Sequence, residues 1–287
     1  MDHREPDSTQ QSRTPNSRAS KGMLSVGFQT LEREVQDLEL EVEGTIPDWL
    51  RGTLLRNGPG KFDYEDQSVN HWFDGHAMLH RFQLTADGVS YSNRMLESDA
   101  HTSAEEEGAL TYSEFATDPC RDRFERVFVM FTGPDITDNA AVSIDRHADR
   151  FIAMTETPIP VEFDPETLET LGHLEFDDDI EGQTSTAHPH RDFERNVTVN
   201  YITQFGRTSR YVVYERDDEN TSRSPVGSVE VDKPAYMHSF GMTEQYVVLA
   251  EFPLRIESAP DAPVEQTVHR ALQLAPGTAR PVHRPRP

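Results

Sequence analysis

The sequence predicts an all-β protein, built either as a β-propeller or as a β-sandwich. Short runs of β-branched and aromatic residues alternate with Gly, Pro, Asn and Asp along most of the 287 residues. Amphipathic helical periodicity is scarce, and only residues 31–40, where Leu31, Val35 and Leu38 are spaced by four and three, form a short helical candidate. Repeated antiparallel hairpins at intervals of tens of residues favour a propeller or a sandwich.

The predicted strands occur mostly as hairpin pairs. Residues 52–60 (GTLLRNGPG) form a strand that runs into a Gly-Pro turn, and residues 78–84 pair with 89–96 across a turn at Asp87 and Gly88. The same pattern of two strands and a polar connection recurs at 150–163 and 168–176, at 210–216 and 227–231, and at 236–242 and 246–252.

Composition divides the chain into three parts. Residues 1–22 are rich in Ser, Arg, Asp, Gln and Pro without periodicity, and we expect them to be a disordered tail. Residues 23–256 carry the strand and turn pattern. Residues 257–287 contain six prolines and no Phe, Tyr or Trp, so we expect a second disordered tail there.

The charge balance is strongly acidic, with 51 Asp and Glu residues against 27 Lys and Arg residues and a net charge of −24. This excess argues against nucleic-acid binding, because contacts to phosphates require clustered Lys and Arg. Abundant carboxylates with only three lysines are typical of a protein that stays soluble in concentrated salt. The alternative is an intrinsically disordered acidic chain, which the recurring aromatic residues from 28 to 252 disfavour.

Other classes of protein are excluded by motifs that the sequence lacks. No run of about 20 apolar residues could span a membrane as a helix. The single cysteine, Cys120, excludes an internal disulfide framework and any multi-cysteine zinc site. The GxSxG, P-loop, dinucleotide-binding and HExxH motifs are absent. We expect a cytoplasmic protein.

Histidines carry the candidate chemistry, because imidazole nitrogens suit first-row transition metals. His188 and His190 flank Pro189, whose ring prevents regular strand pairing there. His238 lies in a predicted strand, on the same face as Tyr236. The residues leave alternatives open: a turn for His188 and His190, and a buried imidazole bound to a backbone carbonyl for His238.

A third group contains His71, His76 and His80. Their H-x4-H-x3-H spacing matches no known zinc pattern, and Asp74 and Gly75 predict a tight turn that would point the side chains in different directions. We expect structural roles for all three histidines, with a zinc site as the alternative.

Glu156 lies within an apolar strand pattern, where an unpaired carboxylate would be unfavourable. It either accepts a hydrogen bond from an imidazole and so orients a metal-bound histidine, or faces solvent at a strand edge. The residues by themselves do not decide between these roles.

Six segments resemble the carotenoid cleavage oxygenases, the family that includes the retinal pigment epithelium isomerohydrolase. Between residues 27 and 256 they run in family order: WLRGTLLRNGPG, HWFDGHAMLHRF, FTGPDITDNAAVSI, AMTETPIPVEFDPETLETLG, TAHPH and AYMHSFGMTEQYVVLAEFPL. The resemblance implies a seven-bladed β-propeller, incomplete in this chain, with a non-haem Fe(II) held by four histidines, three of them backed by glutamates. It also implies that O2 cleaves a double bond of a carotenoid or apocarotenoid, and that the protein touches membranes peripherally.

The resemblance assigns roles to four positions. His188 in TAHPH matches the first iron ligand, and His238 in YMHSFG matches the second. Glu156 in MTET matches the glutamate that holds the second ligand, whereas His190 matches a position that is not a ligand. In the family, the other two ligands lie further along the sequence than this chain extends.

Residues 257–287 do not continue the family pattern, and we hypothesise a shift of reading frame between residues 256 and 257. Codons exist for this tail that, read one base later, encode a family-like segment with a KPF motif, so the nucleotide sequence tests the idea. Two functions then follow. One is an Fe(II)-dependent oxygenase acting on a polyene, of which this chain alone would be inactive. The other is a non-catalytic propeller fragment with a binding role.

Overall fold

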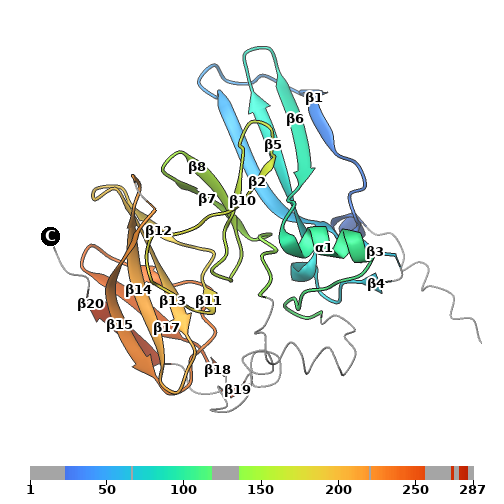
Figure 1. Cartoon of the computed structure of the whole chain (residues 1–287). Helices are drawn as coiled ribbons and strands as arrows, with labels where there is room; N and C mark the ends of the chain where they lie inside the picture. Colours follow the sequence, from blue (N-terminus) through green and yellow to red (C-terminus); the bar gives the residue numbers. More distant parts are fainter. Residues whose placement is uncertain are drawn as a thin grey trace, which may run out of the picture.

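The computed structural model confirms the all-β prediction, and it describes residues 23–65, 67–117, 136–219, 221–255, 273–274 and 278–283. In this part of the chain, antiparallel sheets follow one another in sequence order, as the blades of a propeller do (Figure 1). The chain thus forms part of a β-propeller. The predicted tail at residues 1–22 and Cys120 lie outside the described residues.

The first sheet has the strand order β1-β6-β5-β2. The predicted hairpin is confirmed, since β5 pairs with β6 across a turn where Gly88 takes a φ of +155°. The predicted Gly-Pro turn is wrong, because β2 continues through Pro59 to Lys61 with a local register shift. A Cβ on Gly60 would lie 2.5 Å from the Cβ of Met78, so glycine permits this close approach of β2 and β5. The strands are β1 (Val35–Leu40), β2 (Gly52–Lys61), β5 (His76–Leu84) and β6 (Val89–Met95).

The helical candidate at residues 31–40 is wrong. Its second half is β1, an edge strand that pairs with β6. Leu31 and Leu38 remain 43% and 47% exposed, so the spacing of the apolar residues does not produce a buried helical face.

An α-helix that the sequence pattern does not predict, α1 (Asp99–Glu107), follows the first sheet. Its caps are ordinary: the Ser98 side chain accepts the N–H of His101 at 3.2 Å, and Gly108 ends the helix with a φ of +66°. The helix is short and buries only three side chains, those of Ala100, His101 and Ala104, which explains its weak periodicity.

The second and third sheets contain two further predicted hairpins, and both are confirmed. Between β9 and β10, the side chain of Asp164 accepts the N–H groups of Glu166 and Thr167 at 2.8 and 2.7 Å and so forms the turn. The second sheet, in order, is β10 (Thr170–His173), β9 (Val161–Phe163), β8 (Arg150–Met154) and β7 (Ser143–His147). The third is β11 (Thr184–Ser185), β13 (Val197–Gln204), β14 (Ser209–Asp217) and β15 (Arg223–Val231), with β12 (His190–Asp192) also paired to β13.

The fourth sheet has the order β16-β17-β20. Strand β20 lies within residues 257–287, where the sequence predicts disorder, and it pairs with β17 from Tyr246 opposite His283 to Glu251 opposite Thr278. This pairing satisfies backbone groups along one edge of β17. The strands are β16 (Gly241–Met242), β17 (Tyr246–Glu251) and β20 (Thr278–His283). The remaining elements are η1 (Met23–Phe28), η2 (Trp72–Asp74), the pair β3 (Asp63–Tyr64) and β4 (Gln67–Ser68), and the pair β18 (Leu254–Arg255) and β19 (Gln273–Leu274).

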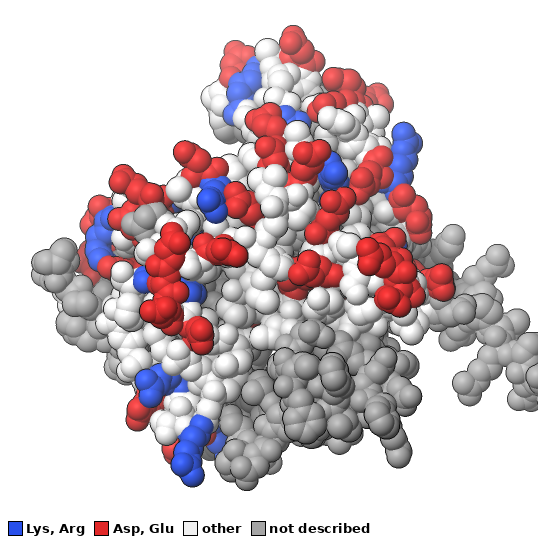
Figure 2. All heavy atoms as spheres, in the orientation of Figure 1, with Lys and Arg blue, Asp and Glu red and all other residues white. Residues whose placement is uncertain are grey.

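Acidic side chains outnumber basic ones on the face shown in Figure 2. They lie over the first sheet and the later sheets alike, with basic side chains scattered among them. No helix in the described segments is both long and apolar enough to cross a bilayer.

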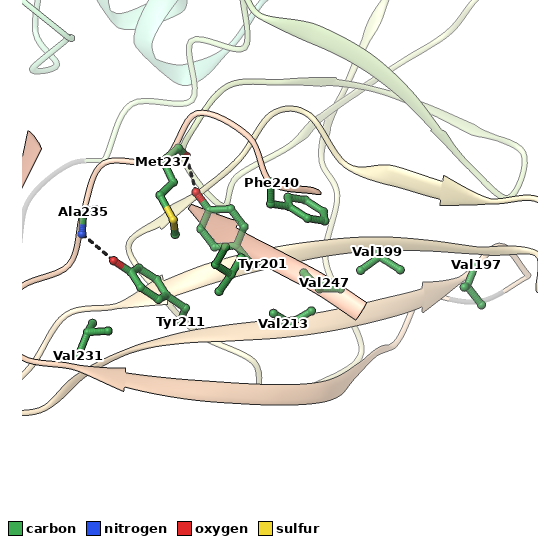
Figure 3. Packing of buried hydrophobic residues seen from close by; sticks show 11 residues of the cluster. Val197, Val199, Tyr201, Tyr211, Val213, Val231, Ala235, Met237, Phe240 and Val247 are labelled. Carbon is green, nitrogen blue, oxygen red and sulfur yellow. Dashed lines mark hydrogen bonds between the residues drawn. The ribbon is translucent and has the colours of Figure 1, made fainter. Parts of the chain in front are cut away.

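Clusters of buried apolar side chains join consecutive sheets. Strand β8 serves two of them: Ala153 packs toward the first sheet, whereas Ile152 and Met154 pack toward the third, as the period of two in a strand requires. The third and fourth sheets share a larger cluster (Figure 3). It consists of Val197, Val199, Tyr201, Tyr211, Val213, Val231, Ala235, Met237, Phe240, Val247 and Leu249.

Two tyrosines of this last cluster anchor the segment that precedes β16. The hydroxyl of Tyr201 donates to the carbonyl of Met237, and the hydroxyl of Tyr211 accepts the N–H of Ala235 at 2.6 Å (Figure 3). The backbone on both sides of Tyr236 is therefore fixed to the third sheet, and this fixes the position of His238.

Candidate metal centre

The candidate centre forms where three connecting segments meet. Glu156 follows β8, His188 follows β11, and His238 lies between β15 and β16. Two expectations about these positions are wrong, because Glu156 lies beyond the end of β8 and His238 precedes β16 instead of lying in a strand. Residues in connecting segments can turn toward a common point, whereas residues in a strand are held on alternate faces.

The rings of His188 and His238 meet edge to face. Their Nε2 atoms are 3.1 Å apart, and the ring planes are inclined by 77°. Two nitrogens that bind one metal ion at about 2.1 Å and at right angles are about 3.0 Å apart. This separation therefore suits two imidazoles that share either a proton or a metal ion. The side chain of His238 is 56% exposed, so the centre is open on one side.

Glu156 orients His238. Its Oε1 accepts a hydrogen bond from Nδ1 of His238 at 2.7 Å. Because Nδ1 then carries the proton, the neutral ring presents the lone pair of Nε2 toward His188. The structure thus brings Glu156 to an imidazole, one of the two alternatives that the residues leave open.

The surroundings of His188 favour its neutral form. Partial burial, followed by the proximity of His238, lowers the pKa of His188, and the opposing effect of Glu156 is smaller. Metal ions bind the neutral imidazole, so this lowering favours metal binding at neutral pH. Two imidazole nitrogens without a thiolate fit a first-row transition metal.

Tyr236 completes the hydrogen bonds around Glu156. Its hydroxyl donates to the carboxylate, at 2.9 Å from each oxygen. Its ring stacks on the ring of His238 with the planes inclined by 22°. The sequence places Tyr236 beside His238 but gives no sign of what its hydroxyl binds.

Thr186 connects the two histidine segments. Its hydroxyl donates to the carbonyl oxygen of His238 and accepts the backbone N–H of His188 at 3.1 Å. Asn200, on β13, donates its amide N–H to the carbonyl of Thr186 at 2.9 Å. Both histidines are therefore positioned by the third sheet.

His190 serves a different purpose from His188. Its Nε2 lies 2.8 Å from the carbonyl oxygen of Phe240, which makes it the donor in a bond that holds the segment before β16. Pro189 separates the two histidines and lets the first reach His238 while the second reaches Phe240.

His71, His76 and His80 go to separate partners, as predicted. Nδ1 of His71 accepts the N–H of Phe73 at 3.1 Å and so caps η2, and Nδ1 of His80 lies 2.8 Å from the hydroxyl of Tyr91. His76 is buried and is hydrogen-bonded to Tyr64. The three histidines therefore do not meet at one point, and the alternative of a shared zinc site is wrong.

A buried polar cluster that the sequence does not predict surrounds His76. The hydroxyl of Tyr64 is hydrogen-bonded to Nδ1 of His76 and lies 3.2 Å from Nδ1 of His101. Nε2 of His76 lies 3.8 Å from the carboxylate of Glu114. Burial, followed by the proximity of His76, lowers the pKa of His101 to about 4. These groups bind one another and tie α1 to the first sheet. The sequence does not predict that His101 joins this cluster, because it does not predict the helix α1.

Asp99, Asp138 and His173 also lie close enough to hold a cation. However, the buried carboxylate of Asp138 already accepts the N–H groups of Asp99 and Ala100 at 2.7 and 2.9 Å, and it lies 2.8 Å from Nε2 of His173. These donors belong to the positive end of α1, which disfavours a cation. We therefore interpret this group as a connection between α1 and the second sheet.

Comparison with known proteins identifies the family. The model of the family described as Retinal pigment epithelial membrane protein (RPE65) matches residues 28–277. The chain belongs to this family. The family model matches this RPE65-family chain beyond residue 256, the position at which the sequence predicts that the family pattern ends.

Curated relatives of this RPE65-family chain are carotenoid-cleaving enzymes. It is 36% identical over 251 residues to mouse (Mus musculus) Beta,beta-carotene 15,15'-dioxygenase, with 80% of this chain and 44% of that protein covered. It is also 36% identical over 242 residues to the mitochondrial Carotenoid-cleaving dioxygenase of Mustela putorius furo, with 79% and 44% covered. The chain therefore spans a little under half the length of these relatives.

Solved structures share the fold of this RPE65-family chain. An ACO/RPE65 chimera superposes with a TM-score of 0.73 at 24% identity, and cobalt-substituted Synechocystis ACO with a TM-score of 0.73 at 23% identity. Each comparison covers 91% of this chain and 56% of the solved chain.

Proposed function

We propose that this chain forms part of an iron(II)-dependent oxygenase that uses O2 to cleave a double bond of a carotenoid or apocarotenoid, giving aldehyde or ketone products, and that the chain alone is inactive. The observation that carries the proposal is the meeting of His188, His238 and Glu156 from three separate segments, in a chain whose relatives are named carotenoid dioxygenases. Bound iron would supply the redox chemistry with O2 that amino-acid side chains lack.

Each residue has a defined task in this proposal. His188 and His238 hold the metal through Nε2, and as neutral ligands they leave the metal its full charge. Glu156 keeps the proton on Nδ1 of His238 and fixes the plane of its ring. His190 is not a ligand, because its Nε2 is used by the carbonyl of Phe240.

A polyene offers no charged group to bind, so apolar contacts must position it. An aromatic patch, formed by Trp72, Phe73 and Phe115, is 40%, 57% and 54% exposed. The rings of Phe73 and Phe115 are 5.5 Å apart, and those of Trp72 and Phe73 are 6.2 Å apart. Contiguous exposed apolar patches mark interaction sites, and we propose that this aromatic patch touches a membrane surface, the phase in which polyenes dissolve.

The metal site can be tested with Co(II), whose visible absorption reports nitrogen ligation. We expect the 287-residue chain to bind Co(II), and His188→Ala or His238→Ala to abolish the absorption bands. His190→Gln is the matched control, because it changes the other histidine of the same TAHPH segment and should leave the bands in place. Binding that survives both alanine substitutions would overturn the proposed centre.

Turnover can be tested by following the visible absorption of β-carotene and of an apocarotenal with Fe(II) and O2. The family resemblance implies four histidine ligands, and two meet among the described residues. We therefore expect weak Fe(II) binding and no turnover by this chain alone. Stoichiometric Fe(II) with cleavage that depends on His188 and His238 would contradict the expected inactivity and confirm the function. Carotenoid binding without any metal would favour the non-catalytic alternative.

A further inference from the structure

The hydroxyl of Tyr236 stands at the start of a chain of hydrogen bonds that ends at the metal centre. It donates to both oxygens of Glu156, at 2.9 Å each, and Glu156 accepts the Nδ1–H of His238 at 2.7 Å. Nε2 of His238, at the far side of the ring, faces His188. The hydroxyl of Tyr236 therefore positions the carboxylate of Glu156, which in turn orients the imidazole of His238.

Glu156 needs this support because it lies partly in solvent. Its side chain is 26% exposed and that of His238 is 56% exposed, so water competes for both groups. A neutral imidazole can carry its proton on either nitrogen, and only the Nδ1–H form leaves the Nε2 lone pair free for a metal. Anything that holds the carboxylate against Nδ1 therefore favours the form that binds a metal.

Tyr236 is suited to this task because it is itself held firmly. Its backbone N–H donates to the carbonyl of Leu254 at 2.9 Å, and the residues on both sides of it are bonded to Tyr201 and Tyr211. Burial, followed by the nearby charge of Glu156, raises the pKa of the Tyr236 hydroxyl, so that it remains a proton donor at neutral pH.

We propose that Tyr236 is a positioning residue of the metal centre, which acts through Glu156 to hold His238 in the Nδ1–H form with Nε2 facing His188. The proposal goes beyond the two histidines and the glutamate that the family resemblance assigns, and it rests on the proposed metal-binding function.

The first test needs no metal. Nitrogen-15 NMR of the imidazole rings in the metal-free chain reports which nitrogen of His238 carries the proton. We expect the Nδ1–H form in the parent protein, and a mixture of both forms in Tyr236→Phe, which keeps the ring stacked on His238 but removes the hydroxyl. The matched control is Tyr91→Phe, because Tyr91 also binds a histidine, His80, at 2.8 Å. An unchanged His238 spectrum in folded Tyr236→Phe would overturn the proposal.

The second test is a double-mutant cycle on Co(II) affinity. We expect Tyr236→Phe and Glu156→Gln each to weaken Co(II) binding by about tenfold or more, the range found when a hydrogen-bond partner of a metal-bound histidine is removed. The double variant should bind no more weakly than Glu156→Gln alone, since Tyr236 acts through Glu156. Additive losses would overturn that route. A parent chain that binds no Co(II) would overturn the proposed function, and the NMR result would still decide the role of Tyr236.

Discussion

Thr186 is the residue on which the backbone of both histidines depends. Its hydroxyl is used twice, as a donor to the carbonyl of His238 and as an acceptor from the N–H of His188. The side chain is 1% exposed, so water cannot replace either bond without a rearrangement. The loss of this hydroxyl would leave two backbone groups, the carbonyl of His238 and the N–H of His188, without their hydrogen-bond partner.

Thr186→Val tests this dependence. We expect the free energy of unfolding to fall by about 1–3 kcal/mol, because valine preserves the shape of threonine and removes both hydrogen bonds. Urea denaturation measures the change. Thr198→Val is the matched control: Thr198 is 4% exposed, and its hydroxyl has no hydrogen-bond partner among the described residues, so the same substitution should be nearly neutral there. Equal losses at the two positions would contradict the role assigned to the Thr186 bonds.

The residues of the centre differ in how far the sequence predicts them. His188, His238 and Glu156 lie in segments that resemble the carotenoid cleavage oxygenases, so the sequence alone identifies them as candidate residues of the metal centre. The tasks of Thr186 and Tyr236 depend on bonds to residues 52 and 80 positions away in the sequence, and no local pattern records such partners. Nothing in a single sequence distinguishes a threonine that is hydrogen-bonded to both histidine segments from one that is bonded to neither.

At the scale of elements, α1 is held near its N-terminal end by polar contacts. Asp138 binds the N–H groups of its first turn, and His101 enters the buried cluster around Tyr64 and His76. The helix therefore depends on buried polar groups whose protonation must not change. This makes its attachment to the first sheet sensitive to acid.

The direction of this sensitivity follows from His101. Its pKa is about 4 in the folded protein against an ordinary 6.5, so the unfolded chain takes up a proton below pH 6.5 while the folded protein does not. We expect the free energy of unfolding to fall as the pH drops from 6.5 to 4, with a contribution from this residue of up to about 3 kcal/mol. Urea denaturation across this pH range measures it.

The charged and titratable groups that face His101 are His76, Tyr64, Glu105 and Lys61, and the parent pH profile contains their contributions as well. The informative quantity is therefore the difference between the parent and His101→Gln, which should show a flatter profile between pH 4 and 6.5. His71→Asn keeps a cap on η2 and should leave the profile as it is in the parent. Parallel profiles for the parent and His101→Gln would refute the assignment.

Hairpins are the elements that the sequence predicts well, because alternation and turn residues lie within a dozen positions of one another. The turns at Gly88 and Asp164 are examples. Elements whose stability comes from elsewhere in the chain are predicted poorly. Residues 35–40 form a strand because they pair with the edge of β6. The helix α1 is stabilised by hydrogen bonds to Asp138 and Tyr64. The segment around His238 leaves the strand pattern because Tyr201 and Tyr211 fix its backbone.

At the scale of the whole molecule, the sheets follow one another as blades, and buried apolar clusters lie between them. A blade between two neighbours must bury both faces, which is why β13 is buried along seven of its eight residues. The centre lies where the second, third and fourth sheets send connecting segments to one place, so its geometry depends on how these sheets pack. The sequence predicts a propeller or a sandwich but not the number of blades, because the packing between blades leaves no repeated motif.

The acidic surface makes the stability of the whole fold depend on salt. The sequence has a net charge of −24, and acidic side chains outnumber basic ones on the face shown in Figure 2. Repulsion among these carboxylates is stronger in the folded protein than in the expanded unfolded chain, and salt screens it over about 10 Å at 0.1 M and about 3 Å at 1 M. Salt should therefore stabilise the folded state.

We expect the melting temperature to rise steadily from 0.1 to 1 M KCl, as differential scanning calorimetry would measure. Replacing four exposed glutamates, Glu41, Glu43, Glu106 and Glu107, with glutamine should raise the melting temperature at low salt and reduce its dependence on KCl. Sucrose at equal osmolality separates charge screening from general exclusion effects, and it should act equally on the parent and on the variant. A melting temperature that falls with KCl, or a variant with the same salt dependence as the parent, would show that surface repulsion does not limit the stability of this fold.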